Sequence, residues 1–136
     1  IENNTWYEKA KLPEVVSAAT AVTSSDSSIL FIGGDKSVVF SEVELLAAKI
    51  AATSDTTIKK ELTAIKNNLQ KTHPGFSKDV LKYNGVSNTW GTYAQLSFTA
   101  PVTTHAFINN NKIYLPAGEI KPGIRTPKIW VGAIKK

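Results

Sequence analysis

The stretch Ile29-Leu30-Phe31-Ile32-Gly33-Gly34 decides the fold class of this 136-residue chain. Four apolar residues in a row are typical of a strand that is buried on both faces, and the two glycines end it. The same features return downstream, where Ile113-Tyr114-Leu115 precede Gly118. Trp6 and Trp90 are separated by 84 residues (90 − 6), and so are Gly34 and Gly118 (118 − 34). The sequence therefore predicts an internal repeat that is built mainly of strands.

Further short strands are expected on both sides of the repeated apolar run. Each candidate is rich in β-branched, aromatic or small apolar residues and is bounded by turn residues, such as those at 24–28 and 84–85. The expected strands cover residues 5–7, 15–22, 79–84, 89–93, 101–108, 111–115 and 127–133.

The segment at residues 38–76 has helical rather than strand periodicity. A repeat of this length exceeds the roughly 40–50 residues of one four-stranded unit, so an insertion is expected. Ser41 and Glu44 predict a capping box for a first helix, and apolar residues spaced by four, three and four from Ile58 predict a second. The sequence therefore predicts a helical hairpin at about 38–76, inserted between β parts at about 1–37 and 77–136.

Composition and charge disfavour several functional classes. The chain lacks cysteine, which excludes disulfides and thiolate chemistry, and His73 and His105 lack the spacing of metal ligands. His73 is expected to act as a cation at the end of the second helix. The net charge of +5 comes mainly from scattered lysines, so nucleic-acid binding is not expected. No apolar run approaches the roughly 20 residues of a membrane span, so none is expected. Because the chain begins at Ile1 and contains no methionine, we expect a mature chain or part of a longer protein.

The segment from Gly118 to Arg125 carries the most informative charges. It contains Glu119, Lys121 and Arg125 around a Pro-Gly pair, between two apolar strands. The sequence predicts a tight, proline-stiffened connection that holds Glu119 and Arg125 as the chemical centre. The alternative interpretation is a surface ion pair that stabilises a loop. By the repeat, Asp35 takes the place of Glu119, but no arginine follows it at the matching distance, so a structural role is expected.

The repeated pattern resembles a kelch repeat. The features that carry the resemblance are the double glycine at Gly33 and Gly34, the Asp-Val-x-x-Tyr-Asn strand at 79–84, and Trp90 six residues later. Kelch repeats form the blades of β-propellers. The resemblance implies an all-β fold of propeller blades that carry a helical hairpin insertion. The second copy departs from the pattern, because Ala117 replaces the first glycine.

The motif at residues 118–126, Gly-Glu-x-Lys-Pro-Gly-x-Arg-Thr, resembles one of the N-acetylneuraminate epimerase (sialic acid mutarotase) family, a group of bacterial kelch propellers. The resemblance implies that Glu119 and Arg125 are the active-site pair. Propellers of this family have about six blades, so the chain is expected to be the C-terminal part of a larger propeller. The rest of the protein would supply the remaining blades, in a cyclically permuted arrangement in some members. The family is mostly periplasmic.

The implied activity is mutarotation of sialic acid by acid–base ring opening, without metal or organic cofactor. Glu119 would transfer the proton, and Arg125 would bind the substrate carboxylate bidentately. Lys121 and His105 are candidate substrate contacts, with a solvated lysine and a structural histidine as the alternatives. Two other functions stay open: a non-catalytic kelch module that binds a glycan or a protein, and a copper radical oxidase of galactose oxidase type, which the absence of cysteine disfavours.

Overall fold

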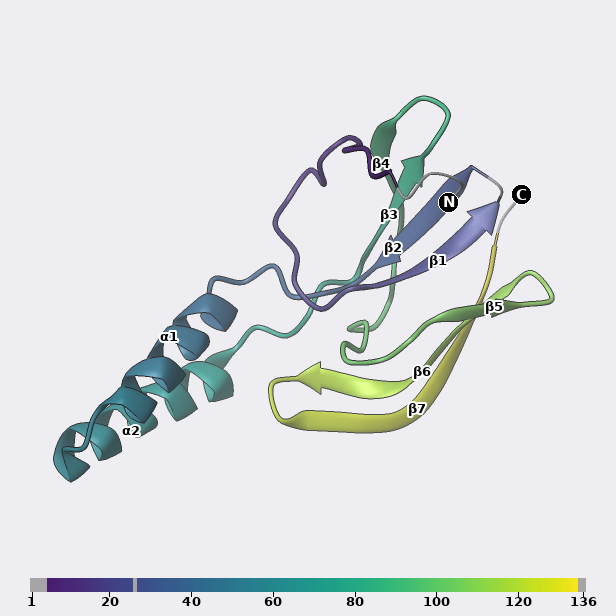
Figure 1. The fold of residues 1–136 in the computed structure, drawn as a ribbon. Coiled ribbons are helices and arrows are strands. Elements are labelled where there is room, and N and C mark those ends of the chain that lie inside the picture. Colours follow the sequence, from purple (N-terminus) through teal and green to yellow (C-terminus); the bar gives the residue numbers. More distant parts are fainter. Residues whose placement is uncertain (1–4, 26, 135–136) are drawn as a thin grey trace.

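The protein forms two antiparallel sheets and one pair of helices in the computed structural model, which describes residues 5–25 and 27–134 (Figure 1). The four-stranded sheet has the order β1 (Thr20–Ser25), β2 (Ser28–Ile32), β3 (Asp79–Asn84), β4 (Thr89–Gln95). The three-stranded sheet has the order β5 (Phe107–Asn109), β6 (Lys112–Lys121), β7 (Ile124–Ala133). The helices α1 (Val39–Ala52) and α2 (Thr56–Thr72) connect β2 to β3. The expected combination of mostly strands with one helical pair is confirmed, and the strand pairs are antiparallel.

The core lies between the two sheets. Leu30, Ile32 and Val80 of the four-stranded sheet pack with Leu115 of β6 in one buried cluster. The prediction that the apolar run of β2 is buried on both faces is wrong, because Ile29 is 40% exposed. Only one face of this sheet contacts the other sheet, so burial along β2 mostly alternates, as in a half-covered antiparallel strand.

The internal repeat is visible in the backbone. Gly34 follows β2 with φ 92°, and Gly118 occupies the matching place on β6 with φ 106°. A β-carbon on Gly118 would lie 2.7 Å from the carbonyl oxygen of Val102, so both the dihedral angle and the space require glycine. After each glycine comes a carboxylate residue whose backbone forms an isolated bridge, through Asp35 in the first copy and Glu119 in the second.

The N-terminal segment differs from the prediction. Residues 5–7 form no strand, and Trp6 is 83% exposed. The backbone of nearby Ala10 forms hydrogen bonds with side chains rather than with a neighbouring strand. Its N–H donates to Asn88 Oδ1 and its carbonyl accepts from Trp90 Nε1, each at 2.9 Å. The strand expected at 15–22 begins only at Thr20, because Ala18 has a positive φ of 55° that extended backbone does not allow.

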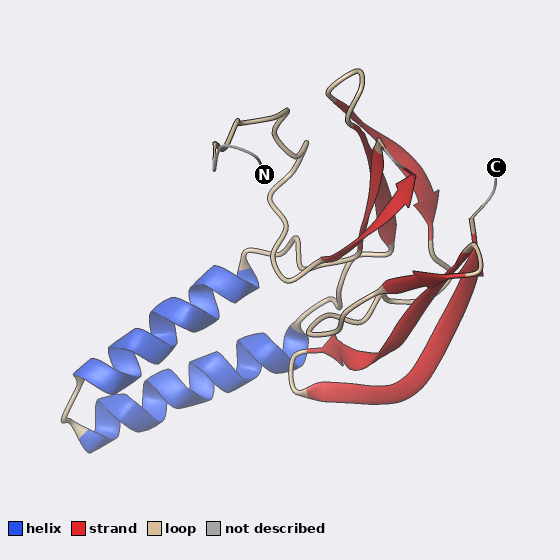
Figure 2. Ribbon diagram, turned by 45° about the vertical axis from the view of Figure 1, so that its right-hand side comes forward, coloured by secondary structure: helices blue, strands red, loops and turns tan. Residues whose placement is uncertain are grey.

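The two helices pack on each other and extend away from both sheets (Figures 1 and 2). The predicted capping box is wrong: α1 begins at Val39, so Ser41 already lies in its first turn, and no side chain caps it. Asp55 caps α2 instead, with Oδ1 accepting from the N–H groups of Thr57 at 2.8 Å and Ile58 at 3.1 Å. Among the described residues, no helix has the length and hydropathy of a membrane span.

Candidate functional site

The β6–β7 hairpin carries the charged motif in a different form from the predicted bend. Glu119 lies within β6 and Arg125 within β7, so only Pro122 and Gly123 form the turn. The two charged residues are direct partners in the ladder, although pairing is irregular on both sides of Glu119. The predicted start of the last strand at Pro127 is wrong. Strand β7 already begins at Ile124, because its pairing with β6 continues beyond each irregularity. Partners across an antiparallel ladder project from the same face, so the side chains of Glu119 and Arg125 start side by side.

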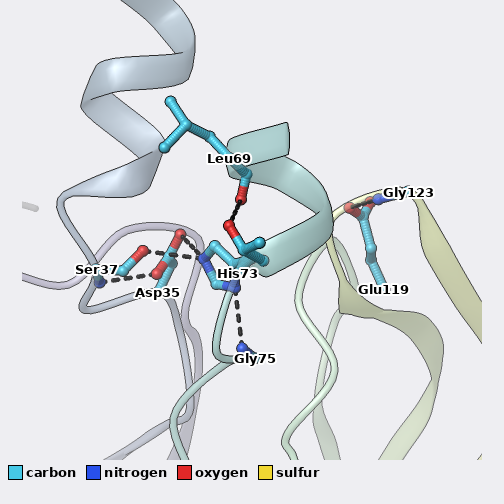
Figure 3. Close-up of polar contacts among 8 residues, drawn as sticks. Asp35, Ser37, Leu69, His73, Gly75, Glu119 and Gly123 are labelled. Carbon is cyan, nitrogen blue, oxygen red and sulfur yellow. Dashed lines mark hydrogen bonds and ion pairs between the residues drawn. The ribbon is translucent and has the colours of Figure 1, made fainter. Parts of the chain in front are cut away.

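The carboxylate of Glu119 is partly buried and folds back over the hairpin turn. Its Oε1 accepts a hydrogen bond from the Gly123 N–H at 2.7 Å, as Figure 3 shows. Its backbone is fixed by two hydrogen bonds to Val102, at 2.8 and 2.9 Å. Within the described residues no ion pair joins Glu119 to Arg125, so the alternative of a loop-stabilising ion pair is not realised here. The strand ladder therefore holds this acid in place while one of its oxygens remains available.

Glu119 lines a cavity of about 230 Å³ at the junction of the helices and the sheets. The first helix contributes Phe40, Val43 and Glu44 to its wall, and the end of the second helix contributes Gln70. The hairpin turn closes another side through Pro122. The cavity thus combines one acid on a strand with apolar and polar side chains from the helices.

Asp35 and His73, both buried, line the same cavity and form a polar cluster with the half-buried Ser37. His73 is 2% exposed and follows α2, while Ser37 lies just before α1. His73 Nε2 lies 3.1 Å from Asp35 Oδ2 and 2.9 Å from Ser37 Oγ, and the Ser37 N–H donates to Asp35 Oδ1 at 2.8 Å (Figure 3). The cluster thereby ties both ends of the helical hairpin to the corner after β2.

Both ring nitrogens of His73 have hydrogen-bond partners. Its Nδ1 accepts from the Gly75 N–H at 3.0 Å, so the ring proton is assigned to Nε2, which faces Asp35. The expected role as a cation at the helix end stays a prediction, and Nε2 lies within ion-pair distance of Asp35. The cluster is no nucleophilic triad, since Ser37 and Asp35 meet the same ring nitrogen instead of opposite ones.

Arg125 is the ladder partner of Glu119, but none of the other predicted site residues lines the cavity of Glu119. Arg125 is exposed on β7, and Lys121 lines an adjoining groove that it shares with Lys71 of α2. His105 is exposed beside Thr23 of β1, on a different cavity. Sequence reasoning missed the helical residues at this site, because a helical insertion gives no signal of where its side chains meet the sheets.

An ion-pair cluster lies outside this cavity. Lys36 Nζ lies 2.5 Å from both Glu14 Oε1 and Asp79 Oδ2. Burial lowers the pKa of Lys36, but the hydrogen bonds to Asp79 and Glu14 outweigh burial, so the pKa is raised. The hydrogen bond from Lys36 lowers the pKa of the Asp79 carboxyl, against an opposing effect of burial. The described residues contain no group of three metal-binding side chains, here or elsewhere.

Comparison with solved structures supports the fold. The chain is similar to the solved structure of the protein YjhT, with a TM-score of 0.68 and 17% sequence identity. The match covers 88% of this chain and 34% of that one. At this identity the likeness shows the fold alone.

Sequence comparisons point to one family. The N-acetylneuraminate epimerase of Salmonella paratyphi B (strain ATCC BAA-1250 / SPB7) is 28% identical over 128 residues, which cover 93% of this chain and 33% of that protein. The N-acetylneuraminate epimerase of Yersinia pestis (strain Pestoides F) is 27% identical over 135 residues, covering 98% and 34%. The chain thus spans about a third of the length of these curated relatives. A family model described as N-acetylneuraminate epimerase matches residues 1–136, and the chain therefore belongs to the N-acetylneuraminate epimerase family.

Proposed function

We propose that this chain supplies the catalytic acid of an enzyme that accelerates anomer interconversion of N-acetylneuraminic acid. Family membership supports the reaction class. The observation that carries the assignment is the position of Glu119, which is partly buried, fixed by its strand and part of a cavity wall. Proton transfer to a bound sugar requires a rigidly held carboxyl beside a cavity that can admit the sugar.

Interconversion needs one proton removed and one delivered. The anomeric hydroxyl loses its proton, the bond between the anomeric carbon and the ring oxygen breaks, and the ring oxygen gains a proton. The resulting open-chain ketone closes again on its other face. Glu119 takes up and returns the proton, with water or a hydroxyl group as relay. Since Oε1 is bonded to the Gly123 N–H, and Oε2 has no partner among the described residues, Oε2 is the atom assigned to the transfer.

The substrate carboxylate is assigned to Arg125. Its side chain starts beside Glu119 on the same face of the β6–β7 hairpin, and a guanidinium binds a carboxylate through two parallel hydrogen bonds. Lys121, in the adjoining groove, adds positive potential near the same end of the hairpin. His105 is left out of this assignment because it lies on a different cavity.

The proposed setting is a kelch β-propeller. The two sheets would be successive blades, the helices an insertion at about 38–76, and the remainder of the protein would supply the other blades of a propeller with about six. The chain's share of about a third of its relatives' length agrees with this arrangement. We place the protein in the periplasm by its family.

Proton NMR of freshly dissolved N-acetylneuraminic acid tests the proposal. The complete protein should speed equilibration of the two anomers. Glu119→Gln should reduce this acceleration by about 10²-fold or more, and Arg125→Lys should raise KM more than it lowers kcat. Folding of each variant is checked by circular dichroism. Binding of the sugar without acceleration by the wild-type protein would contradict the proposal and favour a non-catalytic binding module.

A further inference from the structure

The cavity beside Glu119 has an apolar side that the proposed proton transfer does not use. Phe40 and Val43 of α1 line it together with Phe76, which follows α2. Phe76 is buried at 9% exposure, whereas Phe40 remains 48% exposed. A half-exposed aromatic side chain on a cavity wall offers apolar surface to a ligand.

The apolar side and the acid come from different parts of the chain. Phe40 and Val43 belong to the inserted helices, while Glu119 belongs to β6. The helical hairpin hardly contacts the sheets along its length, so its contacts with them are concentrated at this cavity (Figure 2). The same end of the hairpin is anchored by the contacts of His73 to Asp35 and Ser37. These contacts hold the base of the helical hairpin at the corner after β2, next to the cavity.

N-acetylneuraminic acid has one apolar group that matches this surface. Its other substituents are a carboxylate, hydroxyl groups and a hydroxylated side chain, and only the acetyl methyl group lacks polar atoms. The acetamido substituent lies across the six-membered ring from the anomeric carbon. A sugar with its anomeric centre at Glu119 can thus direct this methyl group away from β6.

We infer that Phe40, Val43 and Phe76 form a subsite for the acetyl methyl group, so that the helical hairpin determines specificity for the acyl substituent. The inference rests on the proposed function. An N-glycolyl sugar carries an additional hydroxyl group at this place, with which none of these three side chains can form a hydrogen bond. Discrimination of about tenfold to a hundredfold is expected, as for other apolar pockets that meet an added hydroxyl.

The test measures kcat/KM of the complete protein for N-acetyl- and N-glycolylneuraminic acid by NMR. The wild type should prefer the N-acetyl sugar by about tenfold or more. Phe40→Ala should lower kcat/KM for the N-acetyl sugar more than for the N-glycolyl sugar and so reduce the ratio. Val43→Thr, which keeps the shape and adds a hydroxyl, should reduce the ratio by improving the N-glycolyl rate. Leu45→Ala is the matched control, on the same helix, 57% exposed and outside this wall, and should leave both rates unchanged.

The outcomes separate the inference from the proposed function. Acceleration of both sugars at equal kcat/KM by the wild type would overturn the subsite and leave the mutarotase proposal standing. An unchanged ratio in both Phe40→Ala and Val43→Thr would do the same. Acceleration of neither sugar would overturn the proposed function and the subsite together. If Phe40→Ala folds poorly, two results still decide the question: the wild-type ratio of kcat/KM for the two sugars, and the change of that ratio in the near-isosteric Val43→Thr.

Discussion

The corner after β2 (Gly34 and Asp35) and the matching stretch within β6 (Gly118 and Glu119), called here the first and second corners, share one backbone design but use their carboxylates differently. In each, a glycine with positive φ precedes an acidic residue on an isolated bridge. Asp35 is 7% exposed, and its two oxygens bond to the Ser37 N–H and to His73. Glu119 is partly buried, holds one N–H of the hairpin turn and lines the cavity.

The difference teaches what separates a structural carboxylate from one available for chemistry. The shared backbone sets where the side chain begins, but the neighbouring segment decides how many of its acceptor sites are occupied. In the first corner the helical insertion supplies His73, and the shorter Asp35 is fully engaged. In the second corner no insertion follows β6, so one oxygen of Glu119 has no hydrogen-bond partner among the described residues. A buried acid with satisfied hydrogen bonds contributes to stability rather than to reactivity.

The largest expected effect comes from exchanging each carboxylate for its amide. Glu119→Gln should reduce the mutarotation rate of the complete protein by about 10²- to 10⁴-fold, the usual contribution of one proton-transfer group, with little change in melting temperature. Asp35→Asn should do the opposite, costing about 1–2 kcal/mol of stability with activity retained. NMR exchange rates and thermal unfolding measure the two effects. A similar loss of mutarotation rate in both variants would contradict the assignment of Asp35 to stability and Glu119 to proton transfer.

Removing the imidazole of His73 should affect stability next most strongly. His73→Ala leaves a cavity and deprives Asp35 of a hydrogen bond, so the free energy of unfolding should fall by about 3 kcal/mol. His105→Ala is the matched control, because His105 is exposed, and should stay within about 0.5 kcal/mol. Urea unfolding of the complete protein gives both values. Equal losses of unfolding free energy in the two variants would contradict a stabilising role for the hydrogen bonds between His73 and Asp35.

The glycine before Glu119 tests whether the backbone design itself is required. Gly118→Ala should cost about 2 kcal/mol, because it combines a positive φ with a β-carbon 2.7 Å from the Val102 carbonyl oxygen. Gly123→Ala has a positive φ of 75° but no atom within 4 Å of the added carbon, so about 1 kcal/mol is expected. Thermal unfolding compares them. The site geometry would be less constrained than the structure indicates if Gly118→Ala proved the milder change.

The smallest effect concerns the residue after each carboxylate, which is Lys36 in the first corner and Ile120 in the second. Because the folded-state pKa of Asp79 is lowered by Lys36, its stabilisation is complete above the ordinary carboxyl pKa of about 4 and is lost as pH falls below it. The partly exposed pair should contribute about 0.5–1 kcal/mol. Asp79→Asn should therefore destabilise at pH 7 and have progressively less effect at acidic pH, as denaturant unfolding at several pH values can show. An Asp79→Asn effect that is independent of pH would assign the loss to packing.

The sequence predicted the parts of this fold that depend on local pattern. The apolar run ending in glycines located β2, and its recurrence located β6, because strand burial and positive φ leave direct marks on residue choice. The capping box at Ser41 failed because α1 begins at Val39 without a side-chain cap. The strand at Trp6 failed because strand formation depends on a neighbouring strand, which short-range pattern does not reveal.

The candidate site was predictable only in its strand residues. Glu119 and Arg125 stand out as charges between apolar strands, and their ladder pairing follows from the hairpin. The contributions of Phe40 and Gln70 depend on the direction in which the helices leave the sheet, and no periodicity encodes that direction. The engagement of Asp35 by His73 joins residues 38 positions apart, and so lay equally beyond local reasoning.

The side-chain contact between Ser37 and His73, 2.9 Å apart, has a consequence for evolution and for engineering. The chain leaves the sheets at Ser37 and returns to them at His73, at nearly the same point, so the two helices form an insertion attached at one place. Lengthening or shortening of the insertion at its far tip, near Ser54, should be tolerated, because loop-closure entropy grows only slowly with length. A reporter domain placed at that tip would leave the attachment intact and could convert changes at the cavity into an optical signal.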